Sequence, residues 1–344
     1  MSSATVTFYE TVLRPILFSM DPEKVHESVM TTLRILSGHP WVLDLIRRDH
    51  EGILGKDLFG IHFPNPVGLA AGFDKNAVAL PAWEAFGFGF IEIGTITARE
   101  QPGNPRPRIF RIPEMEALIN RLGFNNEGVE KISARLEHIR AASRWPTIPV
   151  GINIGKSKIV LLEEAVSDYI QSFNRLLDLG DYFVLNVSSP NTPDLRKLQE
   201  QGAIEELFKA VQERNSGKPL LVKIAPDLTF AQLDYILASA LDYKLAGVVA
   251  TNTTIDQQTV PVGKRQTGGL SGTPLRSRSL EILNYIKRHS SLPVISVGGI
   301  MSADDAIVRF DAGADLVQIY TGFIYHGPAL VKQIARKSNN PKPL

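Results

Sequence analysis

Cysteine is absent from the 344-residue sequence. Its absence excludes disulfide bonds, cysteine-bound zinc or iron–sulfur centres, and a thiol that acts as nucleophile or base. The seven histidines show no paired spacing typical of a metal site. We therefore expect no metal at the functional site.

Long apolar runs and one-sided charge are also missing. No stretch of about 18 apolar residues occurs, so the sequence predicts no transmembrane helix. The N-terminus lacks the layout of a signal peptide and the arginine-rich, acid-poor character of a mitochondrial presequence. A net charge of +1, with no segment dense in lysine and arginine, disfavours nucleic-acid binding. A bacterial protein on the cytoplasmic side fits these features best.

The residues that are present have the composition of a folded protein, with 44% hydrophobic and 21% charged. The length suits a barrel of about 250 residues with additions. From about residue 64, short apolar runs typical of strands alternate with longer helical stretches. We expect strands at Pro66–Ala71, Phe88–Thr95, Val150–Ile154, Tyr182–Val187, Leu220–Ile224, Gly247–Thr251, Val294–Val297 and Leu316–Tyr320.

Helical stretches such as residues 161–179, 230–241 and 303–311 lie between these strands. This alternation predicts a parallel sheet, and the apolar character of the strands indicates that both faces of the sheet are covered. The predicted fold is therefore an α/β fold, a (β/α)8 TIM barrel with a small N-terminal helical extension. An open, doubly wound sheet is the structural alternative.

The first 50 residues follow a different pattern. Apolar residues between Phe8 and Leu17 recur at helical spacing and form one face. A second helix is expected over residues 23–37, with Asp21 as its N-cap and Pro22 at its start. The pair predicts either a cap packed on the barrel or a hydrophobic docking module. We accordingly divide the chain into an N-terminal extension, 1–50, and a barrel domain, 51–344.

Glycine-rich segments follow the last expected strands. Gly298-Gly299 comes after the seventh strand, Thr321-Gly322 after the eighth, and Gly269-Leu-Ser-Gly272 forms a further glycine-rich loop. Glycine lets main-chain N–H groups approach a phosphate, which in barrels commonly lies after strands seven and eight. Any one segment alone would indicate a tight turn, but together they predict a phosphate site.

Amides and hydroxyls gather at the ends of the expected strands, accompanied by Lys75 and Lys223. Isolated asparagines near turns usually form local hydrogen bonds. A set that converges on one barrel mouth instead suits a planar, anionic, carbonyl-rich ligand, because amides both donate and accept while lysines balance negative charge. The set comprises Thr95, Asn120, Asn153, Asn186, Ser189, Asn191, Thr251 and Asn252.

Nine ordered blocks of sequence carry a resemblance to a known family. They are Asn65–Lys75, Glu92–Thr95, Pro102–Arg111, Ile119–Asn126, Gly151–Lys156, Asn186–Pro193, Lys223–Asp227, Ala250–Thr254 and Gly268–Gly272. On these blocks, and over residues 8–330 as a whole, the chain resembles the dihydroorotate dehydrogenases.

The resemblance implies a flavin mononucleotide (FMN) cofactor, a dihydroorotate site and Ser189 as the catalytic base. FMN would contact Ala70, Ala71, Gly72, Thr95, Asn153, Asn186, Lys223, Thr251, Gly272, Gly299, Tyr320 and Thr321. Dihydroorotate would be held by Lys75, Asn120, Arg121, Leu122, Gly123, Phe124, Asn186, Asn191, Asn252 and Thr253. The cytosolic branch of the family uses a cysteine base, so a chain without cysteine resembles the quinone-dependent branch.

That branch has an N-terminal helical extension that forms a hydrophobic tunnel to the flavin. Residues 1–50 would be this membrane- and quinone-docking extension, with His26, Arg111 and Tyr320 as polar residues of the tunnel. A lone histidine such as His26 is otherwise a surface or capping residue. The sequence departs from the family at Asp194, where we expect glycine in a loop that folds over the substrate.

The activity implied by the resemblance is oxidation of (S)-dihydroorotate to orotate in pyrimidine biosynthesis, with electrons passing through FMN to a membrane quinone. The expected protein is a monomer attached peripherally to the cytoplasmic side of a bacterial inner membrane.

Three other functions remain open on the sequence alone. A soluble enzyme that uses fumarate or NAD would need a cysteine base or a partner subunit. A flavin-free lyase or isomerase barrel would fit the glycines but not the asparagines. A non-catalytic binding barrel should have lost Ser189 or Lys223, and both are present.

The glycine segments and Lys223 lead to a prediction about the purified protein. It should be yellow, with FMN bound non-covalently and released by denaturation, as an absorbance spectrum and chromatography of the released flavin would show. Recovery of FAD, or of no flavin even after reconstitution, would contradict the cofactor assignment.

Overall fold

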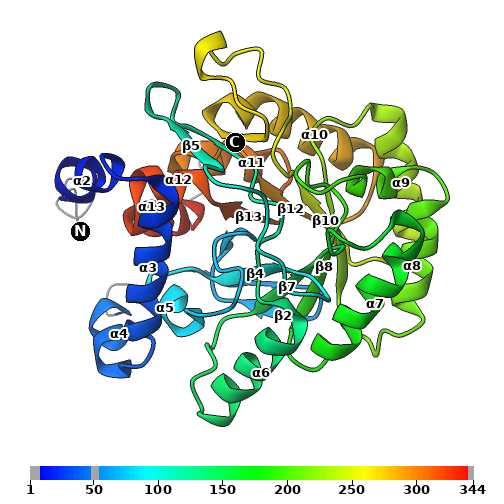
Figure 1. Cartoon of the computed structure of the whole chain (residues 1–344), viewed down its shortest axis with the longest axis horizontal. Coiled ribbons are helices and arrows are strands. Elements are labelled where there is room, and N and C mark those ends of the chain that lie inside the picture. The colour runs from blue at the N-terminus through cyan, green and yellow to red at the C-terminus, as the bar shows by residue number, and fades with distance from the viewer. Residues whose placement is uncertain (1–7, 48–53, 340–344) are drawn as a thin grey trace.

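The computed structural model describes residues 8–47 and 54–339, and its centre is a closed barrel of eight parallel strands (Figure 1). The barrel strands are neighbours in chain order, and the ring closes where the last pairs with the first. They are β3 (Val67–Leu69), β4 (Phe90–Ile96), β7 (Val150–Ile154), β8 (Tyr182–Asn186), β9 (Leu220–Ile224), β10 (Gly247–Ala250), β12 (Val294–Val297) and β13 (Leu316–Ile319). The predicted TIM barrel is confirmed, and the open-sheet alternative is wrong.

Aromatic side chains fill the barrel interior near the N-terminal ends of the strands. A Cβ on Gly151 would lie 2.1 Å from Tyr182 Cζ, so only glycine leaves room for this ring. Phe63 packs edge-on against Phe90, with ring centroids 5.3 Å apart. Phe63 belongs to the hairpin formed by β1 (Lys56–Leu58) and β2 (Ile61–Phe63). Because this end is filled by side chains, a ligand site must lie at the other end.

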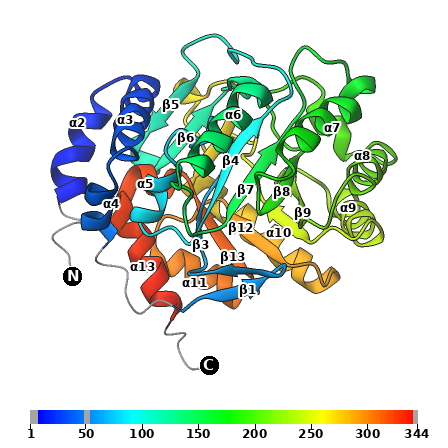
Figure 2. The ribbon, with the colours of Figure 1, turned by 90° about the horizontal axis from the view of Figure 1, so that it is seen from below.

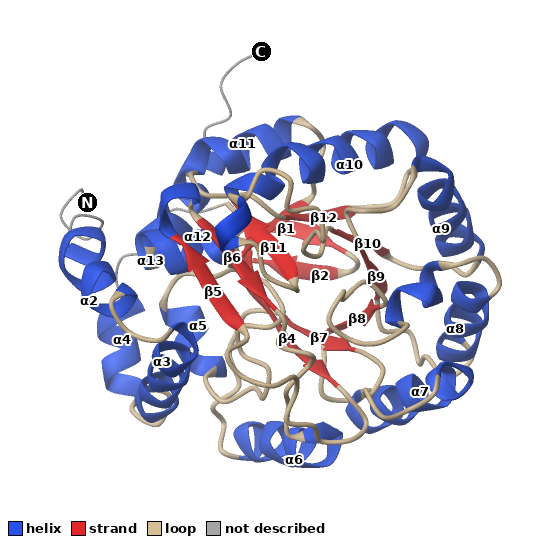
Figure 3. Ribbon diagram, turned by 45° about the horizontal axis from the view of Figure 1, so that its top comes forward, coloured by secondary structure: helices blue, strands red, loops and turns tan. Residues whose placement is uncertain are grey.

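Helices cover the outside of the barrel (Figure 3). Capping boxes fix the start of two of them, with Thr229 and Gln232 at α9 and Ser302 and Asp305 at α11. The outer helices are α5 (Leu80–Ala85), α6 (Gly128–Ala141), α7 (Ala165–Leu176), α8 (Ala203–Gln212), α9 (Phe230–Asp242), α10 (Arg276–His289), α11 (Ala303–Asp311), the short α12 (Thr321–His326) and α13 (Pro328–Ser338).

A three-stranded antiparallel sheet, which the sequence analysis did not predict, lies over the barrel mouth. Its central strand β6 (Ala117–Asn120) pairs with β5 (Ile109–Ile112) and with β11 (Gly269–Gly272). Residues 269–272 therefore form a strand, and our expectation of a glycine-rich loop there is wrong. Strands of four residues show too little alternation to be recognised, and the pairing of β6 with β11 joins segments about 150 residues apart.

The N-terminal helices pack against one side of the barrel (Figure 2). They are a π-helical turn, η1 (Tyr9–Leu13), followed by α2 (Arg14–Phe18), α3 (Pro22–Leu36) and α4 (Pro40–Arg47). The Asp21 carboxylate accepts the N–H groups of Glu23 at 3.0 Å and Lys24 at 2.9 Å, which confirms the predicted N-cap. The predicted domain boundary at residue 50 lies outside the described residues. Within the described ranges, no helix has the length and apolar character needed to cross a membrane.

Candidate active site at the barrel mouth

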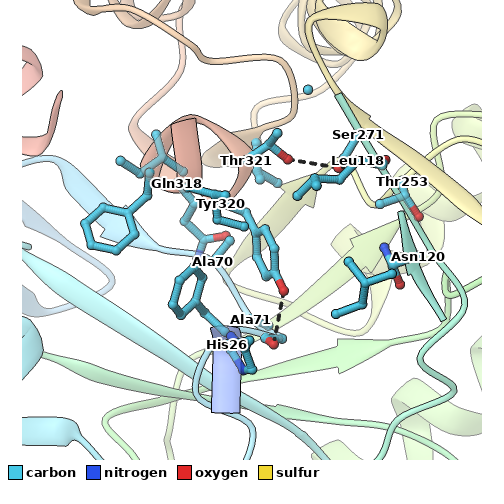
Figure 4. Close-up of a pocket in the computed structure, with 18 of the residues that line it drawn as sticks. His26, Ala70, Ala71, Leu118, Asn120, Thr253, Ser271, Gln318, Tyr320 and Thr321 are labelled. Atoms are coloured by element: carbon cyan, nitrogen blue, oxygen red, sulfur yellow. Dashed lines mark hydrogen bonds between the residues drawn. The ribbon is translucent and has the colours of Figure 1, made fainter. Parts of the chain in front are cut away.

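A cavity of about 410 Å³ lies between the C-terminal ends of the barrel strands, the three-stranded sheet and the N-terminal helices. Its volume falls within the range of small-molecule sites, about 300–1,000 Å³. The wall draws on residues from Tyr9 to Pro328, so nearly the whole chain contributes to it. In the view of Figure 4, Asn120 and Thr253 lie apart from His26, with Tyr320 between them.

Most of the residues predicted from the resemblance line this cavity, although they are distant in sequence. Those assigned to FMN are Ala70, Ala71, Gly72, Thr95, Asn186, Lys223, Thr251, Gly272, Gly299, Tyr320 and Thr321. Those assigned to dihydroorotate are Lys75, Asn120, Leu122, Gly123, Phe124, Asn186, Asn191, Asn252 and Thr253. Ser189, His26 and Arg111 line the same cavity. Asn153 and Arg121 do not.

Asn153 lies behind the wall and supports two residues that line it. The Thr95 hydroxyl donates to Asn153 Oδ1, and the Asn186 amide donates to the same oxygen at 3.1 Å and to Thr95 Oγ1 at 2.9 Å. These three side chains form one buried polar cluster. Asn153 therefore orients Thr95 and Asn186, whereas the sequence analysis predicted that it would contact the cofactor.

The Arg121 side chain is directed out of the cavity. Its guanidinium donates to the carbonyls of Pro107 at 2.9 Å and Thr267 at 3.4 Å, and it lies over the Phe110 ring, 4.8 Å from the centroid. The side chain thus holds surface segments together. This guanidinium does not line the cavity, and the predicted substrate contact of Arg121 stays a prediction.

Glu92 supports the cavity wall from behind, and the sequence analysis assigned it no role. Its carboxylate is fully buried on β4 and accepts the Asn153 amide at 2.7 Å and the Gln318 amide at 2.6 Å. The Lys223 ammonium lies 3.8 Å from the same carboxylate. The signal was present in the sequence, because a single acid within an apolar strand must be paired when the strand is buried.

Ser189 lies at a polar end of the cavity, among asparagines. Its Oγ accepts the main-chain N–H of Asn191 at 3.3 Å, and the Asn191 amide donates to the side-chain oxygen of Asn120 at 3.2 Å. The Asn252 amide donates to Ser188 Oγ at 3.0 Å. These bonds fix the orientations of the Asn191 and Asn252 amides near Ser189, a residue that is only 6% exposed.

Lys75 places a cation at the same polar end. Burial is the main cause that lowers the pKa of Lys75 to about 8, and the Arg108 guanidinium is the second. The Glu23 carboxylate has the opposite effect on this pKa. At neutral pH the side chain therefore remains largely charged. Its neighbour Asp74 does not face the cavity as a partner charge, because its carboxylate accepts the N–H groups of Val78 and Ala79 at the start of α5.

The opposite end of the cavity is apolar and is enclosed by the N-terminal helices. The His26 ring packs edge-on against Phe73, with centroids 5.3 Å apart, and Tyr320 lies against the same phenylalanine at 5.2 Å. Burial, and to a lesser extent Lys75, lower the pKa of His26 to about 3, so the ring is neutral. The apolar wall includes Leu13, Leu17, Phe18, Val25, Val29, Leu33, Phe323 and Ile324.

Arg111 is the cation of this apolar end, and its hydrogen bonds shape the end itself. The guanidinium donates to the main-chain carbonyls of Leu17, Phe18 and Met20 at 2.9–3.2 Å, where α2 ends. It also lies over the Phe18 ring, 4.6 Å from the centroid. Arg111 therefore anchors α2 to β5 as well as lining the cavity.

The segment after Ser189 includes a short 3₁₀ turn, Leu195–Gln199, and borders the polar end. Asp194 has a φ of +58°, in the left-handed region that favours the glycine expected there. Aspartate is one of the few other residues that adopt this conformation. Arg196, which the sequence analysis missed, donates to the carbonyls of Ser188 at 3.0 Å and Thr253 at 3.1 Å. Arg196 thus ties the segment to two walls of the pocket.

Comparison with known proteins agrees with this geometry. The family model described as Dihydroorotate dehydrogenase matches residues 53–340. The chain belongs to the dihydroorotate dehydrogenase family. Among curated members, the "Dihydroorotate dehydrogenase (quinone)" of Gloeobacter violaceus is 49% identical, over 93% of this chain and 91% of that protein. The protein of the same name from a Synechococcus species is 45% identical, over 98% and 96% of the two chains.

Solved structures of the dihydroorotate dehydrogenase family resemble this fold as well. DHODH from Eimeria tenella in complex with ferulenol has a TM-score of 0.79 and 36% identity, over 88% of this chain and 90% of that chain. The ligand-free form from the same organism has a TM-score of 0.78 and 37% identity, over 89% and 94%.

Proposed function

We propose that this chain oxidises (S)-dihydroorotate to orotate, a step of pyrimidine biosynthesis, and passes the electrons to a membrane quinone. The observation that carries the proposal is one cavity with two chemically different ends, a polar end with Ser189 and Lys75 and an apolar end between the N-terminal helices. The names of the curated relatives support the same activity and the same acceptor.

FMN is the proposed cofactor, and the cavity wall between the two ends fits it. At Gly72, with a φ of +96°, an added Cβ would meet only Tyr320 at 3.5 Å, so the main chain there is open to a flat ring. Gln318 Oε1 is buried without a hydrogen-bond partner among the described residues. The residues that would hold FMN are Ala70, Ala71, Gly72, Thr95, Asn186, Lys223, Thr251, Gly272, Gly299, Tyr320 and Thr321.

The polar end provides what the substrate needs. Lys75 balances the substrate carboxylate, and the amides of Asn120, Asn191 and Asn252 can donate to and accept from its imide edge. Conversion to orotate removes a proton from C5 and a hydride from C6. FMN, when bound, supplies the hydride acceptor.

Ser189 is the proposed base for the C5 proton. A serine hydroxyl is a weak base at its ordinary acidity, so it depends on a dry, closed site and on cations that stabilise the developing enolate. Burial of Ser189 and the Arg196 bonds that hold the following segment against the pocket support this role. Closure of that segment over the substrate would exclude water.

The apolar end is the proposed quinone site, with neutral His26, Arg111 and Tyr320 as its polar residues. Apolar side chains of the N-terminal extension are also exposed: Phe8, Ile16 and Trp41 are 56%, 57% and 71% exposed. Such a surface suits peripheral attachment to a bilayer. We propose attachment to the cytoplasmic side of a bacterial inner membrane, and that the protein acts as a monomer.

The choice of acceptor tests this function against a soluble enzyme. Orotate formation by the FMN-loaded protein should be fast with a quinone and negligible with fumarate or NAD, because only the quinone fits the apolar end. The assay follows orotate absorbance with each acceptor in turn. Turnover with fumarate or NAD but not with quinone would contradict the proposal.

Replacement of Ser189 by alanine tests the base. Flavin reduction by dihydroorotate, measured by anaerobic stopped flow, should slow roughly 10²–10⁴-fold, the usual range for a positioned general base. Orotate binding should change little, because Lys75 and the asparagines remain. A reduction rate within about threefold of wild type would remove Ser189 from this role.

A further inference from the structure

Helix α3 brings a buried carboxylate to the polar end of the cavity as well as apolar residues to the other end. Glu23, in the first turn of α3, is 6% exposed and faces Arg108, which is 5% exposed. Arg108 Nη2 donates to Glu23 Oε1 at 2.7 Å, and Arg108 Nε donates to Oε1 at 2.9 Å and to Oε2 at 3.2 Å. This is a bidentate, buried ion pair between segments 85 residues apart.

The remaining donors of Arg108 fix a turn beside the substrate site. Arg108 Nη1 donates to the carbonyls of Pro102 at 2.6 Å and Asn104 at 2.8 Å. The Glu23 carboxylate therefore orients a guanidinium whose other edge holds residues 102–104 in place. The guanidinium can do this only while its charge is balanced, because an unpaired buried cation is costly.

Asn104 connects this turn to two segments of the polar end. Its amide donates to the carbonyls of Arg121 at 2.9 Å and Asn191 at 3.2 Å. Its Nδ2 would lie 2.7 Å from a Cβ added to Gly123, so the amide packs directly against that glycine. Gly123 and Asn191 are both proposed to contact dihydroorotate. The chain of contacts thus runs from α3 to the substrate site.

The same ion pair sets the charge around Lys75. Among the described residues, the charged or titratable groups that act electrostatically on this ammonium lie on its own segment, on α3 and before β5, and they are Asp74, Glu23, His26, Glu27 and Arg108. Arg108 lowers the pKa of Lys75 and Glu23 raises it. Loss of the Glu23 charge would remove the largest of the carboxylate effects that oppose Arg108, and would make Lys75 easier to deprotonate.

We propose that Glu23 is a positioning residue for the dihydroorotate site, acting through Arg108 and Asn104 on the substrate-binding loops and through charge on Lys75. This inference rests on the proposed function. It implies that α3 serves both half-reactions, so a truncation that removes α3 would damage the polar end as well as the quinone end.

Glu23→Gln in the FMN-loaded protein tests the inference. Orotate affinity should fall on the order of ten- to a hundredfold, the scale on which small displacements of a site act. The pH above which orotate binding weakens should also move downward, because loss of the Glu23 carboxylate lowers the pKa of Lys75. Orotate titrations followed by the flavin spectrum at several pH values measure both effects.

Glu27→Gln is the matched control. It lies one turn further along α3, is exposed, and pairs with the exposed Arg106, which also lies 3.3 Å from Glu23 Oε1. Its orotate affinity should stay within about threefold of wild type, since an exposed ion pair contributes little. Reoxidation of reduced flavin by quinone should be unchanged within about twofold in both variants, because the apolar end is not altered.

Wild-type orotate affinity and pH profile in folded Glu23→Gln would overturn the positioning role. If that variant does not fold, Asn104→Ala, which leaves the ion pair intact, should weaken orotate binding instead, and unchanged binding there would overturn the proposal. Failure of the wild-type protein itself to bind orotate would contradict the proposed function, so the two failures are distinguishable.

Discussion

The Glu92 carboxylate lies where the barrel core meets the cavity, and the floor of the site depends on it. A fully buried carboxylate is costly unless its oxygens are paired, and here Asn153, Gln318 and Lys223 surround it. Asn153 in turn orients Asn186, which lines the cavity. Loss of Glu92 would leave the Asn153 and Gln318 amides without this acceptor. The hydrogen bonds that pair the buried carboxylate also hold these side chains in place. A rigid polar surface of this kind suits a planar cofactor.

The three-stranded sheet and the N-terminal helices add the remaining walls of a cavity with two ends. The three-stranded sheet brings Asn120 over the polar end, and Arg111 of β5 binds the carbonyls at the end of α2. Helix α3 has a role at both ends, with Glu23 paired to Arg108 and His26 packed on Phe73. The extension and the barrel consequently form one site. A ligand at the polar end and a ligand at the apolar end can then both reach one cofactor between them, without competing for the same part of the cavity.

The sequence predicted the barrel well because apolar strands and their helices are local patterns. The bounds of β7, β9 and β12 match the predicted ones, and Asp21 caps α3 as expected. The strands β5, β6 and β11 were not predictable, since each has only four residues and β11 is defined by pairing with the distant β6. The resemblance named the residues of the cavity wall but not their directions. It could not show that Asn153 lies behind the wall or that Arg121 points outward, and it left the partners of Glu23 and Glu92 unassigned.

Sequential-mixing stopped flow on the FMN-loaded protein tests the two-ended cavity most directly. Dihydroorotate is mixed anaerobically to bleach the flavin, and a long-chain quinone is then added with or without saturating orotate. The account predicts that flavin absorbance returns at the same rate in both cases, because orotate occupies the polar end and quinone the apolar one. Competitive inhibition of reoxidation by orotate would contradict it, since both ligands would then need the same pocket.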